Sequence, residues 1–178
     1  VLYALSRLQS GSRPGFVAAG LPYVGLAAMA LSWLRAAPAP AGFLNLLWVF
    51  GVVWVTDSAA YLVGRRGGGP KLAPHISAAK TWSGAVGGLL GAGAIGAAVA
   101  LAVGGQPGVL VVASLALSVI AQVGDLAESA VKRHFGVKDS GVIIPGHGGL
   151  FDRADALLAA APGAALALSF VGADGLWR

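Results

Sequence analysis

The sequence predicts an all-α fold, a polytopic bundle of about five transmembrane helices with a polar active site that faces the cytoplasm. Of its 178 residues, 57% are hydrophobic and only 11% are charged, against roughly 25% charged residues in a soluble domain. The mean hydropathy of +0.79 agrees. A soluble globule needs more charge on its surface, and a disordered chain is less apolar. The composition therefore excludes both classes.

Five apolar stretches carry the prediction of transmembrane helices. A helix needs about 20 mostly apolar residues to cross a bilayer. Four stretches meet this length, and the fifth is shorter and contains Pro162. Turn-forming Pro and Gly residues separate them, as at Pro38 and Pro40. The predicted spans are residues 15–34, 41–64, 82–104, 107–122 and 156–171.

Two polar segments lie between these spans, residues 65–81 and 124–155. The first is a short basic loop. The second is longer, and we expect its first part, to about Phe135, to continue the fourth helix. We therefore expect residues 1–178 to form one integral-membrane domain. Since the chain opens at Val1 without a signal-peptide pattern, we also expect it to be a fragment that lacks upstream helices.

The basic residues predict the orientation of the chain. With the N-terminus in the cytoplasm, ten of the twelve Lys and Arg residues lie inside, as the positive-inside rule requires. Only Arg35 and Arg178 then lie outside. Both polar segments thus share the cytoplasmic face. The net charge of +5 indicates contact with anionic lipid headgroups here, and not with nucleic acid.

Several kinds of site are excluded. The chain has no cysteine, so disulfides, thiolate zinc sites and cysteine nucleophiles are absent. The three histidines lack zinc-site spacing. Residues 64–71 resemble a P-loop, but Pro70 stands where the motif requires lysine. The glycines within residues 84–96 favour close helix packing.

The acidic residues are concentrated in one part of the chain. Five of seven fall within about thirty positions, and Asp57 lies near the cytoplasmic end of the second span. A solvated loop with mutually neutralised charges is the plain alternative. However, Asp125 and Glu128 directly follow an apolar span, and a spacing of three puts both on one helix face. Ionisable groups at the hydrocarbon edge usually mark a site. The five are Asp125, Glu128, Asp139, Asp152 and Asp155, interleaved with Lys132, Arg133, Lys138, His147 and Arg153.

The residue types in this region suit phosphate chemistry. The glycines of residues 145–149 let the backbone approach a ligand closely, and a helix begins soon afterwards, whose N-terminus offers N–H groups to an anion. Carboxylates hold Mg²⁺, and Mg²⁺ with Lys and Arg neutralises phosphate charge during phosphoryl or nucleotidyl transfer.

These motifs together resemble the signature of phosphatidate cytidylyltransferases (CDP-diacylglycerol synthases). Over 27 positions the chain has SAVKR at 129–133, KDSG at 138–141, PGHGG at 145–149 and DRAD at 152–155. Residues 54–61, 71–82 and 121–125 agree as well. The chain departs at Ser83, where the family commonly has Glu, and at Ala79, where a basic residue is lost.

The resemblance implies a reaction in which CTP and phosphatidic acid give CDP-diacylglycerol and pyrophosphate, with Mg²⁺ as cofactor and a second, monovalent cation left open. It also implies a bacterial inner membrane and a homodimer, whose interface residues 84–96 suit. The implied metal ligands are Asp125 and Asp152, supported by Asp139 and Glu128, and the catalytic residues are Asp125, Asp139, Asp152, Lys132, Arg133 and His147. The implied substrate-binding residues are Lys80, Lys138, Arg153, Ser129, Gly148, Gly149 and Asp57.

Three alternatives stay open on the sequence. A CDP-alcohol phosphatidyltransferase also uses Mg²⁺ on a CDP-lipid, but its Asp-Gly-x2-Ala-Arg hallmark is absent. A transporter or channel explains carboxylates such as Asp57 along an ion path but not the basic, glycine-rich loop. The third alternative is an inactive homologue with a structural role.

Overall fold

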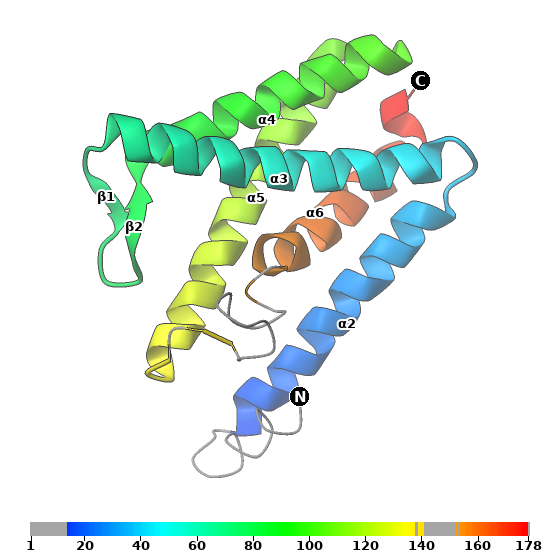
Figure 1. Cartoon of the computed structure of the whole chain (residues 1–178). Coiled ribbons are helices and arrows are strands. Elements are labelled where there is room, and N and C mark those ends of the chain that lie inside the picture. Colours follow the sequence, from blue (N-terminus) through cyan, green and yellow to red (C-terminus); the bar gives the residue numbers. More distant parts are fainter. Residues whose placement is uncertain (1–13, 138, 141–151, 153, 178) are drawn as a thin grey trace.

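The computed structural model describes residues 14–137, 139–140, 152 and 154–177, and these form a helical bundle (Figure 1). Helices α3 and α4 lie side by side, α5 crosses them, and α6 packs between α5 and α2. The all-α prediction is confirmed, and each predicted span falls on a helix. The elements are α2 (Pro14–Ala36), α3 (Ala41–Gly67), β1 (Lys71–Ala73), β2 (Ser77–Thr81), α4 (Trp82–Val103), α5 (Pro107–His134), α6 (Asp155–Val171) and the short 3-10 helix η2 (Gly175–Trp177).

The helix ends follow local chemistry. Helix α4 begins after Thr81, whose side-chain oxygen accepts a hydrogen bond from the backbone N–H of Gly84 at 3.1 Å. It ends at Gly104, which adopts the left-handed conformation with φ 73°. Pro107 then occupies the first turn of α5, where its missing N–H costs nothing. Helix α5 continues to His134, which confirms the prediction that it extends beyond the apolar span.

The loop between α3 and α4 contains a hairpin that the sequence analysis missed. Strands β1 and β2 pair antiparallel, with Lys71 opposite Thr81. The chain leaves α3 at Gly68 and Gly69, which have φ values of 57° and 91° that other residues rarely adopt. It reverses between the strands at residues 74–76, where the Ile76 N–H donates to the Ala73 carbonyl at 3.1 Å. The strands are short and poor in β-branched residues. Their pairing therefore follows from the reversal between two packed helices more than from strand propensity.

Glycines let α4 approach its neighbours closely. A Cβ on Gly84 would lie 2.7 Å from the carbonyl oxygen of Ala60 on α3, and one on Gly96 would lie 2.6 Å from Ser114 Oγ on α5. The predicted role in helix packing is confirmed. These glycines face α3 and α5 of the same chain, and a subunit interface at residues 84–96 stays a prediction. The homodimer itself stays a prediction.

Buried polar side chains tie the helices together inside the bundle. Trp48 Nε1 of α3 donates to Ser114 Oγ at 2.9 Å, and Thr56 Oγ1 donates to Ser118 Oγ at 3.0 Å. Gln122 Nε2 donates to the same Ser118 oxygen at 3.2 Å. Hydrogen bonds between groups that cannot reach water are costly to break. They therefore fix the register of α3 against α5.

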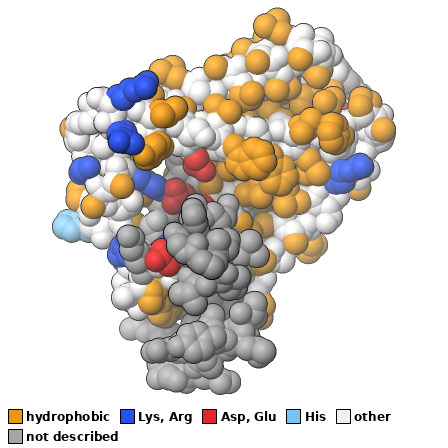
Figure 2. Space-filling model, in the orientation of Figure 1, with side chains coloured by type: hydrophobic (Ala, Val, Ile, Leu, Met, Phe, Trp, Pro, Cys, Tyr) orange, Lys and Arg blue, Asp and Glu red, His pale blue; other side chains and the backbone are white. Residues whose placement is uncertain are grey.

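The outer surface of the bundle is apolar. Helices α3, α4 and α5 are each long and apolar enough to cross a membrane. In the most apolar stretch of each helix, only 28%, 28% and 33% of the residues are buried by the rest of the chain. Hydrophobic side chains cover much of the face shown in Figure 2. Helix α6 is apolar but shorter, at 17 residues. The length and composition of α3, α4 and α5 indicate a membrane protein. In the described part of the chain, these three helices correspond to three of the five predicted spans.

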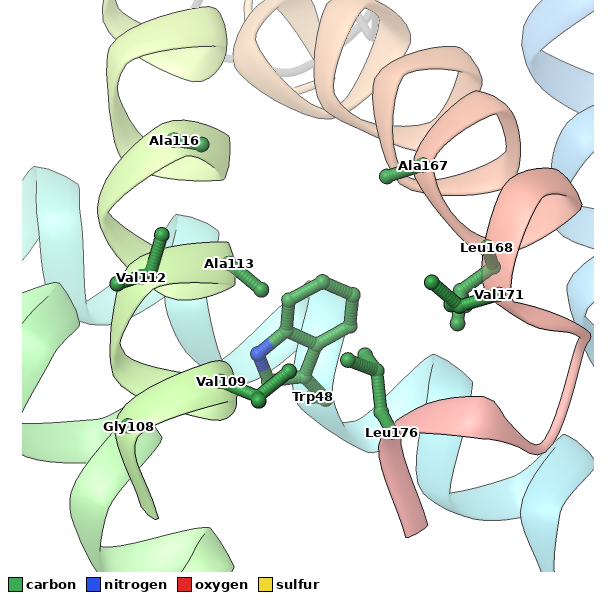
Figure 3. A pocket seen from close by; sticks show the side chains of 10 residues that line it. All are labelled: Trp48, Gly108, Val109, Val112, Ala113, Ala116, Ala167, Leu168, Val171 and Leu176. Carbon is green, nitrogen blue, oxygen red and sulfur yellow. The ribbon is translucent and has the colours of Figure 1, made fainter. Parts of the chain in front are cut away.

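A pocket of about 420 Å³ lies between α3, α5, α6 and η2 (Figure 3). Its lining is apolar, and the indole N–H of Trp48, the polar atom that borders it, already donates to Ser114. No lining residue is titratable. The pocket is therefore a packing defect or an apolar recess, and the chemistry lies elsewhere. It is lined by Trp48, Gly108, Val109, Val112, Ala113, Ala116, Ala167, Leu168, Val171 and Leu176.

The glycine packing leads to a test of the fold. Gly96→Ala should lower the free energy of unfolding by about 1 to 3 kcal/mol, because the new methyl group overlaps Ser114 Oγ and the Leu110 carbonyl oxygen. Gly25→Ala on α2 is the matched control, since nothing lies within 4 Å of its Cβ position. Thermal unfolding of both variants in detergent measures the difference. Equal unfolding temperatures would contradict the close approach of α4 to α5.

Candidate functional site

The candidate site lies where the second half of α5, the start of α6 and strand β2 meet. Asp125, Glu128, Ser129 and Lys132 follow one another on α5 at spacings of three or four, so they share one helix face. Figure 2 shows the acidic side chains gathered in one place. The predicted convergence of Asp125 and Glu128 on one face is confirmed.

Lys132 joins α5 to the segment that precedes α6. Its Nζ lies 2.8 Å from Glu128 Oε2 and 2.9 Å from Asp152 Oδ1. The backbone N–H of Ser140 donates to both carboxylate oxygens of Asp152, at 3.1 and 2.9 Å. The side chains of Lys132, Glu128 and Asp152 are 16%, 17% and 10% exposed. Lys132 thus neutralises two carboxylates that have little access to water.

Lys80 brings the hairpin into the site. Its ammonium forms an ion pair with Asp125 Oδ2, and Ser129 Oγ donates a long hydrogen bond of 3.5 Å to the other oxygen of the same carboxylate. Asp57 on α3 is near enough to interact electrostatically with both Asp125 and Lys80. The side chains thus come from α3, β2 and α5, three elements that are distant in the sequence.

The described part of the site has more negative than positive charge. Asp155, the first residue of α6, lies close enough to repel both Asp125 and Glu128. The described part of the site therefore contains two lysines and five carboxylates. An excess of hard oxygen ligands fits a divalent cation such as Mg²⁺. The lysines are Lys80 and Lys132, and the carboxylates are Asp57, Asp125, Glu128, Asp152 and Asp155.

The donor chemistry fits a cation, but the described side chains do not form a finished ligand set. Within residues 14–137, 139–140, 152 and 154–177, no three Asp, Glu or His side chains converge on one point. Lys80 and Lys132 instead stand beside the carboxylates. The predicted ligands Asp125, Glu128 and Asp152 are thus brought near one another, with ammonium groups as their direct partners.

Two predicted residues lie apart from the carboxylates. Arg133 is exposed and donates to the backbone carbonyls of Ile76, in the hairpin turn, and Val137, at 3.2 and 3.1 Å. Asp139 is exposed and forms no ion pair with another described residue. Five further predictions fall outside the described residues: Lys138, His147, Gly148, Gly149 and Arg153.

The structure also shows contacts that the sequence analysis missed. Ser83 Oγ donates to the carbonyl oxygen of Gly68 at 2.5 Å and lies 3.1 Å from Thr81 Oγ1. Ser83, noted above as a departure from the family pattern, therefore ties the end of α3 to the start of α4. Asp155 was counted among the acidic residues but not chosen for the site. The position of Asp155 at the start of the last apolar span could have indicated that it belongs to the site, as Asp125 does at the end of the fourth span.

The geometry can be compared with known proteins. A model described as the cytidylyltransferase family matches residues 2–171, nearly the whole chain. This chain belongs to the cytidylyltransferase family. The match includes every described carboxylate and lysine of the candidate site. The resemblance drawn from the sequence motifs is thereby confirmed.

Individual members of the family are similar over most of this chain. It is 56% identical over 149 residues to a phosphatidate cytidylyltransferase of Brucella suis, which covers 83% of this chain and 54% of that protein. It is 42% identical over 149 residues to a phosphatidate cytidylyltransferase of Staphylococcus saprophyticus, and this match covers 83% of this chain and 56% of that protein. It is 45% identical over 123 residues to one of Staphylococcus aureus, a match that covers 68% of this chain and 47% of that protein. The chain spans about half the length of the curated relatives it matches.

Lys132 provides a test of the site as a folded unit. Lys132→Met should lower the free energy of unfolding by about 3 kcal/mol, because it leaves Glu128 and Asp152 without a cation in a place with little water. Lys71→Met, on an exposed lysine, is the matched control. Adding Asp152→Asn to Lys132→Met should recover part of the loss, since the two residues interact directly. Additive effects of the two substitutions would contradict the ion pair.

Proposed function

We propose that this chain is the catalytic part of a phosphatidate cytidylyltransferase, which converts CTP and phosphatidate into CDP-diacylglycerol and pyrophosphate. The observation that carries the proposal is the cluster of carboxylates and lysines at the end of α5, at the edge of an apolar bundle. A charged nucleotide reaches this edge from water, and a lipid phosphate reaches it from the bilayer. The names of the similar proteins support the same reaction.

In the proposed reaction a phosphate oxygen of phosphatidate attacks the α-phosphorus of CTP. One P–O bond forms between them, and the bond from the α-phosphorus to the bridging oxygen of the β-phosphate breaks, so that pyrophosphate leaves with its electron pair. The nucleophile is already an anion, and no general base is required. Positioning and neutralisation of charge then supply most of the rate. Lys80 and Lys132 have the charge and the place for this task.

The carboxylates are proposed to hold Mg²⁺, with Asp125 and Asp152 as principal ligands and Glu128 and Asp139 in support. When bound, the ion would neutralise phosphate charge and orient the triphosphate. The lysines that now pair with Asp125 and Asp152 would then be available to phosphate oxygens. The excess of carboxylates over lysines supports this proposal. A second, monovalent cation is a further option at the same cluster.

The remaining residues receive roles from the resemblance to the family. Arg133, Lys138 and Arg153 would bind phosphate groups, and Ser129, which donates a hydrogen bond to Asp125, would contact the substrate. Asp57 would border the pocket beside Lys80. The loop with His147, Gly148 and Gly149 would close on the nucleotide.

We further propose that the site faces the cytoplasm of a bacterial cell, with the chain in the inner membrane and assembled as a homodimer. The described basic residues support this orientation. Arg35 lies in the last turn of α2, whereas the other described Lys and Arg residues lie in the last turn of α3, in the hairpin and in the last turn of α5. That asymmetry obeys the positive-inside rule. The comparisons support neither a CDP-alcohol phosphatidyltransferase nor a transporter.

The activity itself is the first test. Purified protein in detergent, supplied with CTP and phosphatidate, should form CDP-diacylglycerol and pyrophosphate in the presence of Mg²⁺ and none in its absence. UTP in place of CTP is the control for nucleotide specificity. Binding of CTP without product formation, or no binding at all, would contradict the proposal for this chain.

The carboxylate roles are tested by substitution. Asp152→Asn should lower turnover by at least about 10³-fold, since it removes a charged ligand and the partner of Lys132. Asp174→Asn is the matched control, because Asp174 lies near η2, away from the site. Circular dichroism and detergent gel filtration check the fold of both variants. Wild-type turnover in Asp152→Asn would remove Asp152 from the mechanism.

A further inference from the structure

Three basic side chains form an exposed strip that the proposed reaction does not use. Arg65 and Arg66 lie in the last turn of α3, and Lys71 begins β1. None of the three forms a salt bridge with a described carboxylate. Arg65 donates instead to the hydroxyl of Tyr61 at 3.0 Å. We call Arg65, Arg66 and Lys71 the basic strip. Figure 2 shows basic side chains at this end of the bundle, apart from the acidic group.

The backbone beneath the basic strip is held in place. Ser83 Oγ donates to the Gly68 carbonyl, and the N–H of Trp82 donates to the Pro70 carbonyl at 3.1 Å. One turn before Arg65, Gly64 packs so closely on α4 that a Cβ would lie 3.3 Å from Gly84 Cα. These contacts hold the end of α3 and the start of β1 against α4. The backbone that carries the three charges is therefore already ordered before any ligand binds.

Two aromatic side chains flank the basic strip. Tyr61 is 62% exposed and Trp82 is 58% exposed, although each lies next to the end of a candidate membrane span. Tyrosine and tryptophan favour the headgroup level of a bilayer, where the ring meets apolar chains and the polar atom meets water. Arg and Lys extend from such positions toward lipid phosphates. These neighbours favour a position of the basic strip at the level of phospholipid headgroups.

We propose that the basic strip binds the headgroup of anionic phospholipids and enriches them beside the candidate site. Arginine offers paired N–H donors that match phosphate oxygens, and each basic residue near an anionic membrane surface contributes about fivefold in affinity. Among the described residues, the site carboxylates form their ion pairs with Lys80 and Lys132 and none with the basic strip. The hairpin makes the two regions neighbours: Lys71 lies opposite Thr81, next to Lys80. This proposal does not depend on the transfer reaction.

The test is the binding of dioleoyl phosphatidylglycerol to the detergent-purified chain, followed by native mass spectrometry, with dioleoyl phosphatidylcholine as the zwitterionic reference. The wild-type chain should prefer phosphatidylglycerol. The triple variant R65Q/R66Q/K71Q should weaken its binding at least about tenfold and leave phosphatidylcholine binding unchanged. R65K/R66K/K71R, which keeps the charge, should retain the preference. Arg35→Gln is the matched control, since it removes an exposed charge at the opposite end of the bundle.

Four outcomes would overturn the proposal: equal affinity of the wild-type chain for both lipids, wild-type binding by the triple variant, equal weakening by Arg35→Gln, or displacement of the lipid by millimolar pyrophosphate that itself binds at the strip. The last outcome would identify a site for soluble phosphate groups. If the triple variant does not fold, the wild-type comparison of the two lipids and the charge-preserving variant still decide the question.

Discussion

Carboxylates at the edge of an apolar bundle need cations, and this requirement organises the site end of the molecule. Lys132 holds Glu128 and Asp152, and Lys80 reaches from the hairpin to Asp125. Each lysine comes from a different element, so neutralising the carboxylates also fixes α5, the hairpin and the segment before α6 relative to one another. Removing a charge here therefore affects the fold as well as the chemistry.

The packing of the helices on one another depends on small residues instead of charge. Gly84 and Gly96 let α4 contact the backbones of α3 and α5, and hydroxyl groups such as Ser114 fill the space that remains. In lipid there is little hydrophobic force between helices, so close packing and internal hydrogen bonds must supply the attraction. These contacts hold α3, α4 and α5 in the arrangement that brings the site residues together.

The sequence predicts the helices and the acidic face well, because apolar length and residue spacing act locally. Helix α5 continues to His134 as expected, and Asp125 and Glu128 share a face. The hairpin and the Lys80–Asp125 pair were missed because they depend on how α3 and α4 close on each other across the chain. Ser83 shows the same limit, because its hydrogen bond to Gly68 depends on the turn that the chain makes at Gly68 and Gly69 after α3.

The length of α5 has a consequence for depth. Its 28 residues extend about 42 Å at 1.5 Å per residue, whereas the hydrocarbon layer is about 30 Å thick. Pro107 lies at one end of this rod, and Asp125 lies about 27 Å along it. A single uninterrupted helix therefore has the length to span the hydrocarbon layer and to carry the carboxylates near its boundary. In the proposed reaction, phosphatidate would then react without leaving the bilayer.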